Sequence, residues 1–175
     1  RIMIVGLAPG AHGSNRTGRM FTGDASGDFL YPALHRAGFA NQPHANHAGD
    51  GLALHGTFIT AICRCVPPQN RPKTLEIRNC LPWLAAEIDL LPNLQGFVAL
   101  GKVAFDGILR MYAAQIQRPP KPTFGHNAIY QLGEGNPWLL ASYHPSQQNT
   151  LTGRLTEAMF AAVWDRVNAV LGSRE

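Results

Sequence analysis

The chain has 175 residues, of which 45% are hydrophobic, and its formal net charge is +4 at pH 7. This length allows one domain with a substantial core. No apolar run approaches the ~20 residues of a membrane-spanning helix, and no signal-peptide pattern is present. We therefore expect a cytoplasmic protein. The positive charge suits a polyanionic partner, although on its own it favours nucleic acid only slightly.

Short apolar runs bounded by turn residues alternate with helical patterns along the chain. The expected strands are Ile2–Val5, Thr57–Ile62, Phe97–Leu100 and Trp138–Ser142, and the expected helices are Ala25–Ala37, Thr74–Leu91, Lys102–Ile116 and Arg154–Leu171. Pro32 should kink or shorten the first helix. Residues 41–51 and 118–136 are rich in Pro, Gly and His and are expected to be loops. The alternation predicts an α/β fold of three layers, αβα, with a central, mostly parallel four-stranded sheet.

Neither an internal repeat nor a linker is evident, so residues 1–175 are expected to form a single domain. The chain begins with Arg1 and enters its first strand at once, which we expect of a fragment that lacks an upstream segment. Its three cysteines, an odd number, argue against a disulfide framework.

Two loops that follow expected strands are the most informative parts of the chain. The first, Gly6 to Asp24, contains five glycines and leads from a strand into a helix, where α/β folds place backbone N–H groups beside a ligand. It lacks the Gly-Lys-Ser/Thr of a P-loop and the glycine spacing of a dinucleotide site. The second is Tyr143-His-Pro-Ser-Gln-Gln-Asn149-Thr-Leu-Thr-Gly-Arg154. Ligands of such sheets bind at the carboxyl ends of the strands, so we expect both loops to meet in one cleft.

These two loops resemble the first and last motifs of the uracil-DNA glycosylase superfamily, and most of all its family 5, the UDGb type. The segment Ile59-Thr-Ala-Ile-Cys-Arg-Cys65-Val-Pro-Pro-Gln-Asn70 resembles the central motif of that family. The three motifs occur in the family's order and span nearly the whole chain. The resemblance implies a base-excision repair enzyme that hydrolyses the N-glycosidic bond of uracil in DNA and leaves an abasic site.

Hydrolysis of such a bond leaves a positive sugar and an anionic base. The base must be held, its charge stabilised, and a water placed at the sugar carbon. The resemblance implies that Phe21 stacks on the base, that His144 donates a hydrogen bond to its O2 oxygen, and that Asp24 orients the water or stabilises the sugar. From the residues alone, Phe21 also suits a core anchor and Asp24 a helix N-cap. The base-binding candidates are Gly6, Leu7, Ala8, Phe21 and Asn70.

Asn70 matches a family residue of the active site, where its amide would bind the edge of a base. A turn residue between prolines is nearly as good an interpretation of it. At the position where the sister family 4 carries an Asn that recognises uracil, this chain has Ala61. Base selection should therefore be looser, which adds hypoxanthine and other deaminated bases to the candidate substrates.

The loop of residues 147–153 is expected to enter the DNA minor groove, with Leu151 as an apolar wedge that partly unstacks the duplex. Arginines of the first and last loops are candidate phosphate contacts, which position a protein without reading sequence. Each of them alone is as well explained as a solvated surface residue. The DNA-binding candidates are Arg16, Arg19, Asn149, Leu151 and Arg154.

Cys65 and Cys80 match two cysteines that, in families 4 and 5, join an upstream Cys-x-x-Cys pair to hold a [4Fe–4S] cluster. Such a cluster normally needs four thiolates, and Cys63 aligns with an apolar family position and suits a buried core residue. The resemblance therefore implies either a structural cluster whose other two ligands lie upstream of Arg1, or no cluster. We favour the former, and we expect no catalytic metal.

The leading hypothesis is a monofunctional glycosylase, because neither loop carries a Lys for lyase chemistry. We expect a monomer, because a glycosylase on this fold needs no second subunit. The alternative is a non-catalytic module of the same fold that binds DNA or a free base, in which replacing Asp24 or His144 would change nothing. A phosphate-ester enzyme would need a divalent metal, and no acid and histidine cluster with ligand spacing is evident.

Overall fold

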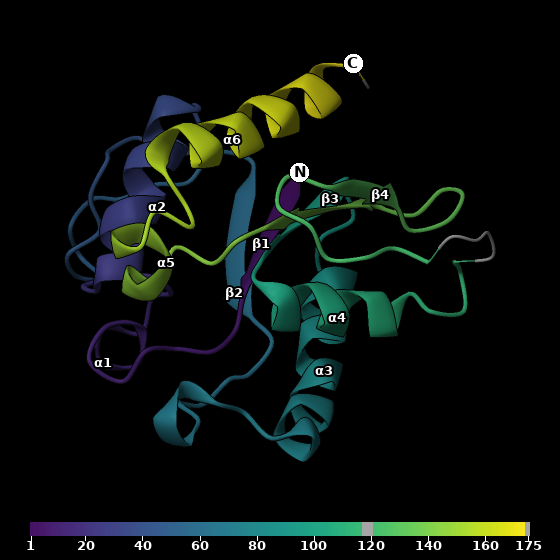
Figure 1. The fold of residues 1–175 in the computed structure, drawn as a ribbon, viewed down its shortest axis with the longest axis horizontal. Coiled ribbons are helices and arrows are strands. Elements are labelled where there is room, and N and C mark those ends of the chain that lie inside the picture. The colour runs from purple at the N-terminus through teal and green to yellow at the C-terminus, as the bar shows by residue number, and fades with distance from the viewer. Residues whose placement is uncertain (117–120, 174–175) are drawn as a thin grey trace.

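The computed structural model describes residues 1–116 and 121–173, and a sheet between two layers of helices forms its centre (Figure 1). The strands are β1 (Ile2–Gly6), β2 (Thr57–Ala61), β3 (Gly96–Leu100), β4 (Ile129–Gln131) and β5 (Trp138–Ser142). Their order in the sheet is β2-β1-β3-β5-β4. The first four strands in this order run parallel, and β4 pairs antiparallel with β5.

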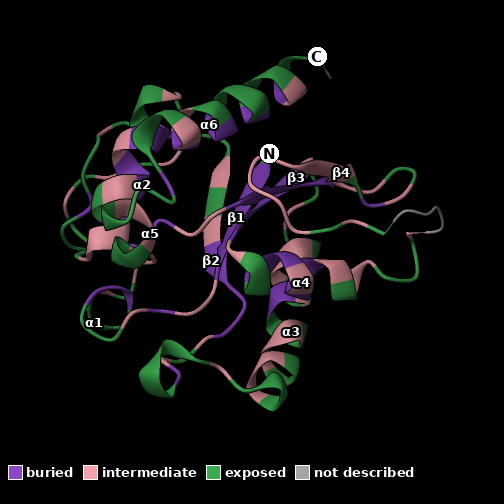
Figure 2. Cartoon of the chain, in the orientation of Figure 1, coloured by how far each residue is buried: buried purple, intermediate pink, exposed green. Residues whose placement is uncertain are grey.

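The helices are α1 (Ser14–Thr17), α2 (Ala25–Arg36), α3 (Thr74–Asp89), α4 (Lys102–Met111), α5 (Gln147–Leu151) and α6 (Glu157–Gly172), with a 3-10 turn, η1 (Pro68–Asn70). Side chains of a strand alternate between the faces of a sheet. Ile2 and Ile4 therefore join the core under α2 and α6, while Met3 and Val5 join the core under α3 and α4. Figure 2 shows that burial is concentrated in the strands and on the inner sides of these helices. No described helix is long and apolar enough to cross a membrane.

The predicted three-layer α/β fold is confirmed, but the predicted count of four strands was wrong. The fifth strand, β4, lies within residues 118–136, where we expected only a loop; residues 118–120 of that stretch lie outside the described part. With three residues, none of them fully buried, β4 is too short for a period to appear in the sequence. It forms because the edge of β5 offers unpaired backbone groups, which β4 bonds in antiparallel register.

The ends of the helices differ from the predicted ends by a few residues. α6 begins at Glu157 rather than at Arg154, because the Thr156 side chain accepts a hydrogen bond from the backbone N–H of Met159 and caps the helix. α4 ends at Met111, before the predicted end at Ile116. Pro32 does not shorten α2, which continues to Arg36 because its apolar face packs into the core.

Parallel strands place the three sequence motifs at one edge of the sheet. The Gly-rich loop leaves β1 after Gly6, the central motif leaves β2 after Ala61, and the last motif leaves β5 after Ser142. The fold thus brings together segments that lie far apart in the sequence.

Candidate active site

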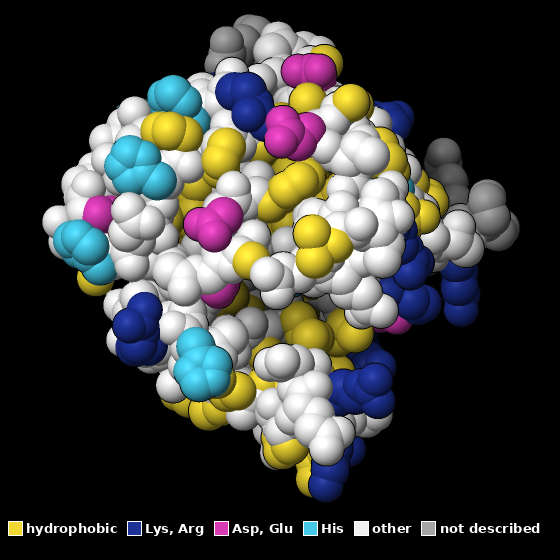
Figure 3. Space-filling view, turned by 60° about the vertical axis from the view of Figure 1, so that its left-hand side comes forward, with side chains coloured by type: hydrophobic (Ala, Val, Ile, Leu, Met, Phe, Trp, Pro, Cys, Tyr) yellow, Lys and Arg dark blue, Asp and Glu magenta, His cyan; other side chains and the backbone are white. Residues whose placement is uncertain are grey.

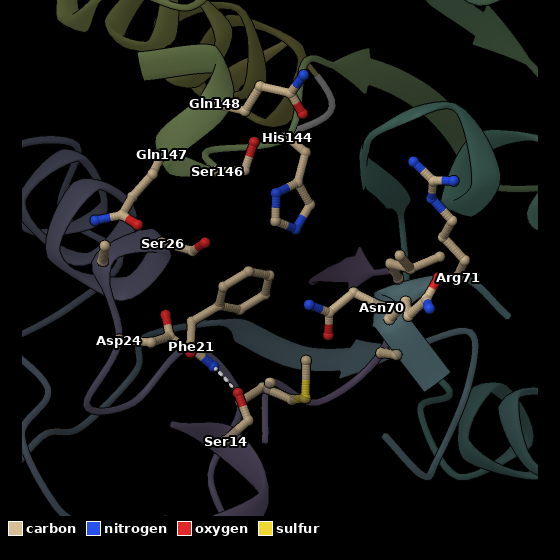
Figure 4. Close-up of a pocket in the computed structure, with 16 residues that line it drawn as sticks. Ser14, Phe21, Asp24, Ser26, Asn70, Arg71, His144, Ser146, Gln147 and Gln148 are labelled. Carbon is tan, nitrogen blue, oxygen red and sulfur yellow. Dashed lines mark hydrogen bonds between the residues drawn. The ribbon is translucent and has the colours of Figure 1, made fainter. Parts of the chain in front are cut away.

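A pocket of about 610 Å³ lies where the three motifs meet (Figure 4). All three loops contribute to it, as expected from the parallel strands. The residues that line it are Leu7, Ala8, Gly10, Ser14, Met20, Phe21, Asp24, Ala25 and Ser26 from the first loop and the start of α2, Gln69, Asn70 and Arg71 from the central motif, and His144, Ser146, Gln147 and Gln148 from the last motif.

Phe21 forms one wall of this pocket and is 3% exposed. Its ring lies 5.8 Å from the ring of His144, measured between centroids, at an angle of 40°. Gly6 does not line the pocket, but it makes room for this ring: a Cβ atom at Gly6 would lie 2.9 Å from Cζ of Phe21, closer than such atoms pack. The aromatic wall therefore depends on a glycine at the end of β1.

Asp24 lies between the Gly-rich loop and α2. Its Oδ1 atom accepts a hydrogen bond of 3.0 Å from the backbone N–H of Gly27, so the predicted N-cap is confirmed. A Cβ atom at Gly13 would overlap the Asp24 carboxyl group, so this glycine lets the carboxylate sit against the loop backbone. Asp24 also lines the pocket, and capping accounts for only one of its oxygens.

His144 follows β5 and points into the pocket above the Phe21 ring (Figure 4). Burial lowers its pKa to about 4, and the negative charge of Asp24 only partly opposes this shift. The imidazole is therefore neutral at pH 7 and has one N–H to donate. Its backbone carbonyl accepts a hydrogen bond of 2.8 Å from the side-chain amide of Asn149, which fixes the start of the last loop.

The lowered pKa of His144 makes a prediction about stability. In the unfolded chain this imidazole takes up a proton near its ordinary pKa of 6.5, whereas in the folded protein it does so only near 4. Between these values the unfolded state binds more protons, so the free energy of unfolding falls as the pH is lowered. We expect the titration of His144 to lower the free energy of unfolding by about 2 to 3 kcal/mol between pH 7 and pH 4.

Urea unfolding at several pH values, with the wild type beside His144→Gln, measures this contribution. The variant lacks the titrating group, so its stability should fall less over the same range. Identical pH dependence in the two proteins would contradict the assigned pKa.

Asn70 reaches the pocket from the central motif, and its amide points toward Phe21 and His144 (Figure 4). It ends the 3-10 turn η1, so the predicted turn is present as well. Gln69 and Asn70 both have positive φ angles, 54° and 56°, which non-glycine residues adopt rarely and mostly at special sites. Ala61 does not line this pocket; it lines a neighbouring cavity of about 380 Å³ that shares Ser14 and Met20 with it.

The five DNA-binding candidates lie outside the pocket, and they differ in what they contact. Leu151 ends α5 and is 83% exposed. The guanidinium of Arg154 lies 4.9 Å from the centroid of the Tyr143 ring, in a cation–π contact. Arg16 donates a hydrogen bond from Nε to the carbonyl of His12.

Arg19 is engaged within the protein. Its guanidinium forms an ion pair of 2.7 Å with Asp50, and its Nε atom donates to the Thr22 hydroxyl. The ion pair, together with three backbone N–H donors, holds the pKa of Asp50 well below its usual range. Arg19 thus ties the first loop to the loop of residues 46–52, a role that the sequence did not indicate because its partner lies 31 positions away.

Of the predicted cluster ligands, Cys65 lies within the central motif and Cys80 in the helix that follows it. Cys65 is exposed, Cys80 in α3 is partly buried, and Cys63 is buried in the core as predicted. Burial, followed by the neighbouring thiol of Cys80 and then by Glu76 and Cys65, raises the pKa of Cys63 to about 11. Within residues 1–116 and 121–173, no group of three or more His, Cys, Asp or Glu side chains is placed to hold a metal ion. The residues present therefore do not make up a four-thiolate site.

Several pocket residues were missed by the sequence analysis. Ser14, Met20 and Ser26 belong to or adjoin the Gly-rich loop, and Gln69 and Arg71 flank Asn70. Their only signal in the sequence was membership of the motifs. Ser146, Gln147 and Gln148 complete the last wall, although we expected residues 147–153 to face the DNA groove.

A glycine-rich loop, an aromatic wall, a neutral histidine and a carboxylate at the carboxyl edge of a parallel sheet define an α/β protein with a polar ligand site. The model of the uracil DNA glycosylase superfamily matches residues 1–168. The chain belongs to this superfamily. Its similarity to type-5 members covers nearly its whole length, which confirms the resemblance drawn from the three motifs.

Three relatives illustrate the similarity. The type-5 uracil-DNA glycosylase of Thermus thermophilus is 52% identical over 163 residues, which cover 93% of this chain and 72% of that protein. The type-5 enzyme of Mycobacterium tuberculosis is 50% identical, with 98% of this chain and 63% of that protein covered. The type-4 uracil-DNA glycosylase of Pyrobaculum aerophilum is 34% identical, with 67% of this chain and 52% of that protein covered. This chain thus spans 63% to 72% of the length of these two type-5 relatives.

Proposed function

We propose that this protein is a monofunctional DNA glycosylase that hydrolyses the N-glycosidic bond of uracil in DNA and leaves an abasic site. The observation that supports this most is the meeting of Phe21, Asn70, His144 and Asp24 around one pocket, in a chain whose relatives are named uracil-DNA glycosylases. A non-catalytic module that binds DNA or a free base remains the alternative that the experiments below test.

Base recognition comes first in the proposed mechanism. A uracil extruded from the duplex stacks on the Phe21 ring, an interaction worth about 1–3 kcal/mol per base. The Asn70 amide bonds the edge of the base, because it offers both a donor and an acceptor. Leu7 and Ala8 line the same pocket and present no ionisable group to the base.

Bond cleavage follows. As the bond between C1′ and N1 breaks, its electron pair passes to the base, and the developing charge on O2 is stabilised by the N–H of His144. A neutral imidazole suits this task because it already carries one N–H at pH 7 and does not have to take up a second proton to donate a hydrogen bond. The Asp24 carboxylate orients the water that attacks C1′ or stabilises the positive sugar; the proton of the water leaves through this carboxylate or to solvent.

DNA outside the pocket contacts the last loop and nearby arginines in this proposal. Leu151, exposed at the end of α5, is the wedge that enters the minor groove. Arg16 and Arg154 contact phosphates, while Arg19 and Asn149 act chiefly on the loops that they bond. Figure 3 shows Lys and Arg side chains gathered along one margin of the molecule, which suits a polyanion.

Leu151→Ala should slow excision from duplex but not from single-stranded DNA; equal slowing on both would contradict the wedge.

Hypoxanthine is proposed as a second substrate. Ala61 stands where family 4 carries an Asn, so this position offers no amide that selects against a purine. The cavity that Ala61 lines adjoins the main pocket at Ser14 and Met20. A duplex with a single inosine should therefore be processed, more slowly than one with uracil. Inosine left untouched at enzyme levels that clear uracil completely would contradict the proposal.

The [4Fe–4S] cluster also stays a proposal. Cys65 and Cys80 would supply two thiolates, and the other two would have to come from outside residues 1–175, since a four-thiolate site needs more than this chain has to offer. The cluster would be structural, because hydrolysis involves no electron transfer. Iron and sulfide analysis of the complete protein, with Cys65→Ser beside it, tests this: iron content that is unchanged in the variant would exclude Cys65.

The overall activity is tested with a labelled duplex that contains one uracil, in EDTA, followed by alkali. We expect a strand break at the uracil only after alkali, and none in a duplex with thymine at that place. A folded protein that produces no break would favour the binding module.

We further propose that the protein acts as a monomer in the cytoplasm. Light scattering of the free protein and of its complex with DNA tests the monomer.

A further inference from the structure

The peptide group that joins Met20 to Phe21 is held at both of its polar atoms by side-chain hydroxyls. Tyr31 in α2 donates a hydrogen bond of 2.7 Å to the carbonyl of Met20, which also accepts a longer bond of 3.3 Å from the Thr22 hydroxyl. Ser14, the first residue of α1, accepts a hydrogen bond of 2.9 Å from the N–H of Phe21, drawn as the dashed line in Figure 4. Both side chains belong to buried residues, since Tyr31 is 1% and Ser14 5% exposed.

The orientation of this peptide sets the φ angle of Phe21 and thus the loop backbone that carries its ring. Phe21 has a φ angle of +53°, in the left-handed region that an aromatic residue rarely adopts and that persists only where the surroundings impose it. Rotation of the 20–21 peptide would exchange its carbonyl and N–H directions and release Phe21 from the left-handed region, so the loop backbone that carries the ring would no longer be fixed. Hydrogen bonds to its opposite ends oppose this rotation. Gly27 packs against the carbonyl of Phe21 so closely that a Cβ atom would overlap it, which leaves the segment little room to adjust.

We propose that Ser14 and Tyr31 are positioning residues, which clamp the 20–21 peptide and thereby hold the Phe21 ring as the platform for the extruded base. The inference rests on the proposed function, because it assumes that Phe21 stacks on the base. Tyr31 does not line the pocket; Ser14 does, and its hydroxyl oxygen accepts the N–H of Phe21. Their effect on the reaction passes through the ring.

The test uses Ser14→Ala and Tyr31→Phe, each of which removes one hydroxyl of the clamp. Tyr130→Phe is a matched control, because the Tyr130 hydroxyl donates an equally short bond of 2.7 Å to the carbonyl of Thr123, away from the pocket. The readouts are the single-turnover excision rate and the Kd for a duplex with a non-cleavable 2′-fluoro uracil nucleotide. Each clamp variant should lower the excision rate and raise the Kd by about 3- to 10-fold. The control should change either quantity by less than about 2-fold.

The same substitutions are then made in a Phe21→Leu background. A clamp that acts through the ring has nothing left to position there, so neither substitution should add a loss of more than about 2-fold. Full losses in that background, or clamp variants that match the control, would overturn the inference. Should Ser14→Ala fail to fold, Tyr31→Phe carries the test, since it keeps the buried ring. A wild type that neither binds nor processes uracil would instead refute the proposed function.

Discussion

Asp24→Asn is expected to lower the single-turnover rate of uracil excision by about 100-fold or more. The amide keeps an oxygen that can accept the hydrogen bond from Gly27, so α2 should stay capped, while the negative charge that handles the water or the sugar is lost. The melting temperature should therefore change little. Loss of activity without loss of stability is the result that separates catalysis from capping.

Two further variants make this comparison sharp. Asp24→Ala removes the cap as well and should lower the free energy of unfolding by about 0.5–2 kcal/mol in addition to the rate. Asp28→Asn removes a negative charge from the same first turn of α2, on an exposed side chain, and should leave the rate unchanged. An Asp24→Asn protein as active as the wild type would confine Asp24 to its structural role and would require another group to act on the water.

His144→Ala is expected to lower the excision rate by about 100- to 1,000-fold, the usual effect of losing one donor to a developing oxyanion. The substitution removes the N–H beside Phe21 without removing a charge, because the imidazole is neutral at pH 7. His144→Gln restores an amide donor and should recover part of the rate. Single-turnover rates measured at saturating enzyme compare the three proteins.

The control for this series is His35→Ala, an exposed histidine in the last turn of α2, which should behave as the wild type. The affinity for the non-cleavable duplex should fall far less than the rate in His144→Ala, since the bond to O2 strengthens as the charge develops. If rate and affinity fell together, His144 would hold the base rather than stabilise its departure.

The main features of the fold were predictable because they rest on local patterns. Four apolar runs became the four parallel strands, and their carboxyl ends, once parallel, had to bring the motifs to one edge. β4 escaped prediction because it depends on the free edge of β5 rather than on its own sequence. The start of α6 shifted because Thr156, not Arg154, supplies the cap.

The site was predictable only where a residue of the three motifs matches a position of the superfamily with an assigned role. Asp24, Phe21, Asn70 and His144 were expected in one pocket and lie there. Residues whose importance comes from a distant partner left no such signal. The bond from Tyr31 to the Met20 carbonyl joins positions 11 apart, and nothing in either residue type indicates it.

The proposed hydrolysis is tested most directly by identifying both of its products by mass spectrometry, from one uracil-containing duplex incubated with the complete protein in EDTA. We predict equal amounts of free uracil and of a full-length strand with the mass of an abasic site. A strand that retains its uracil, or one that is already broken before alkali, would contradict a monofunctional glycosylase.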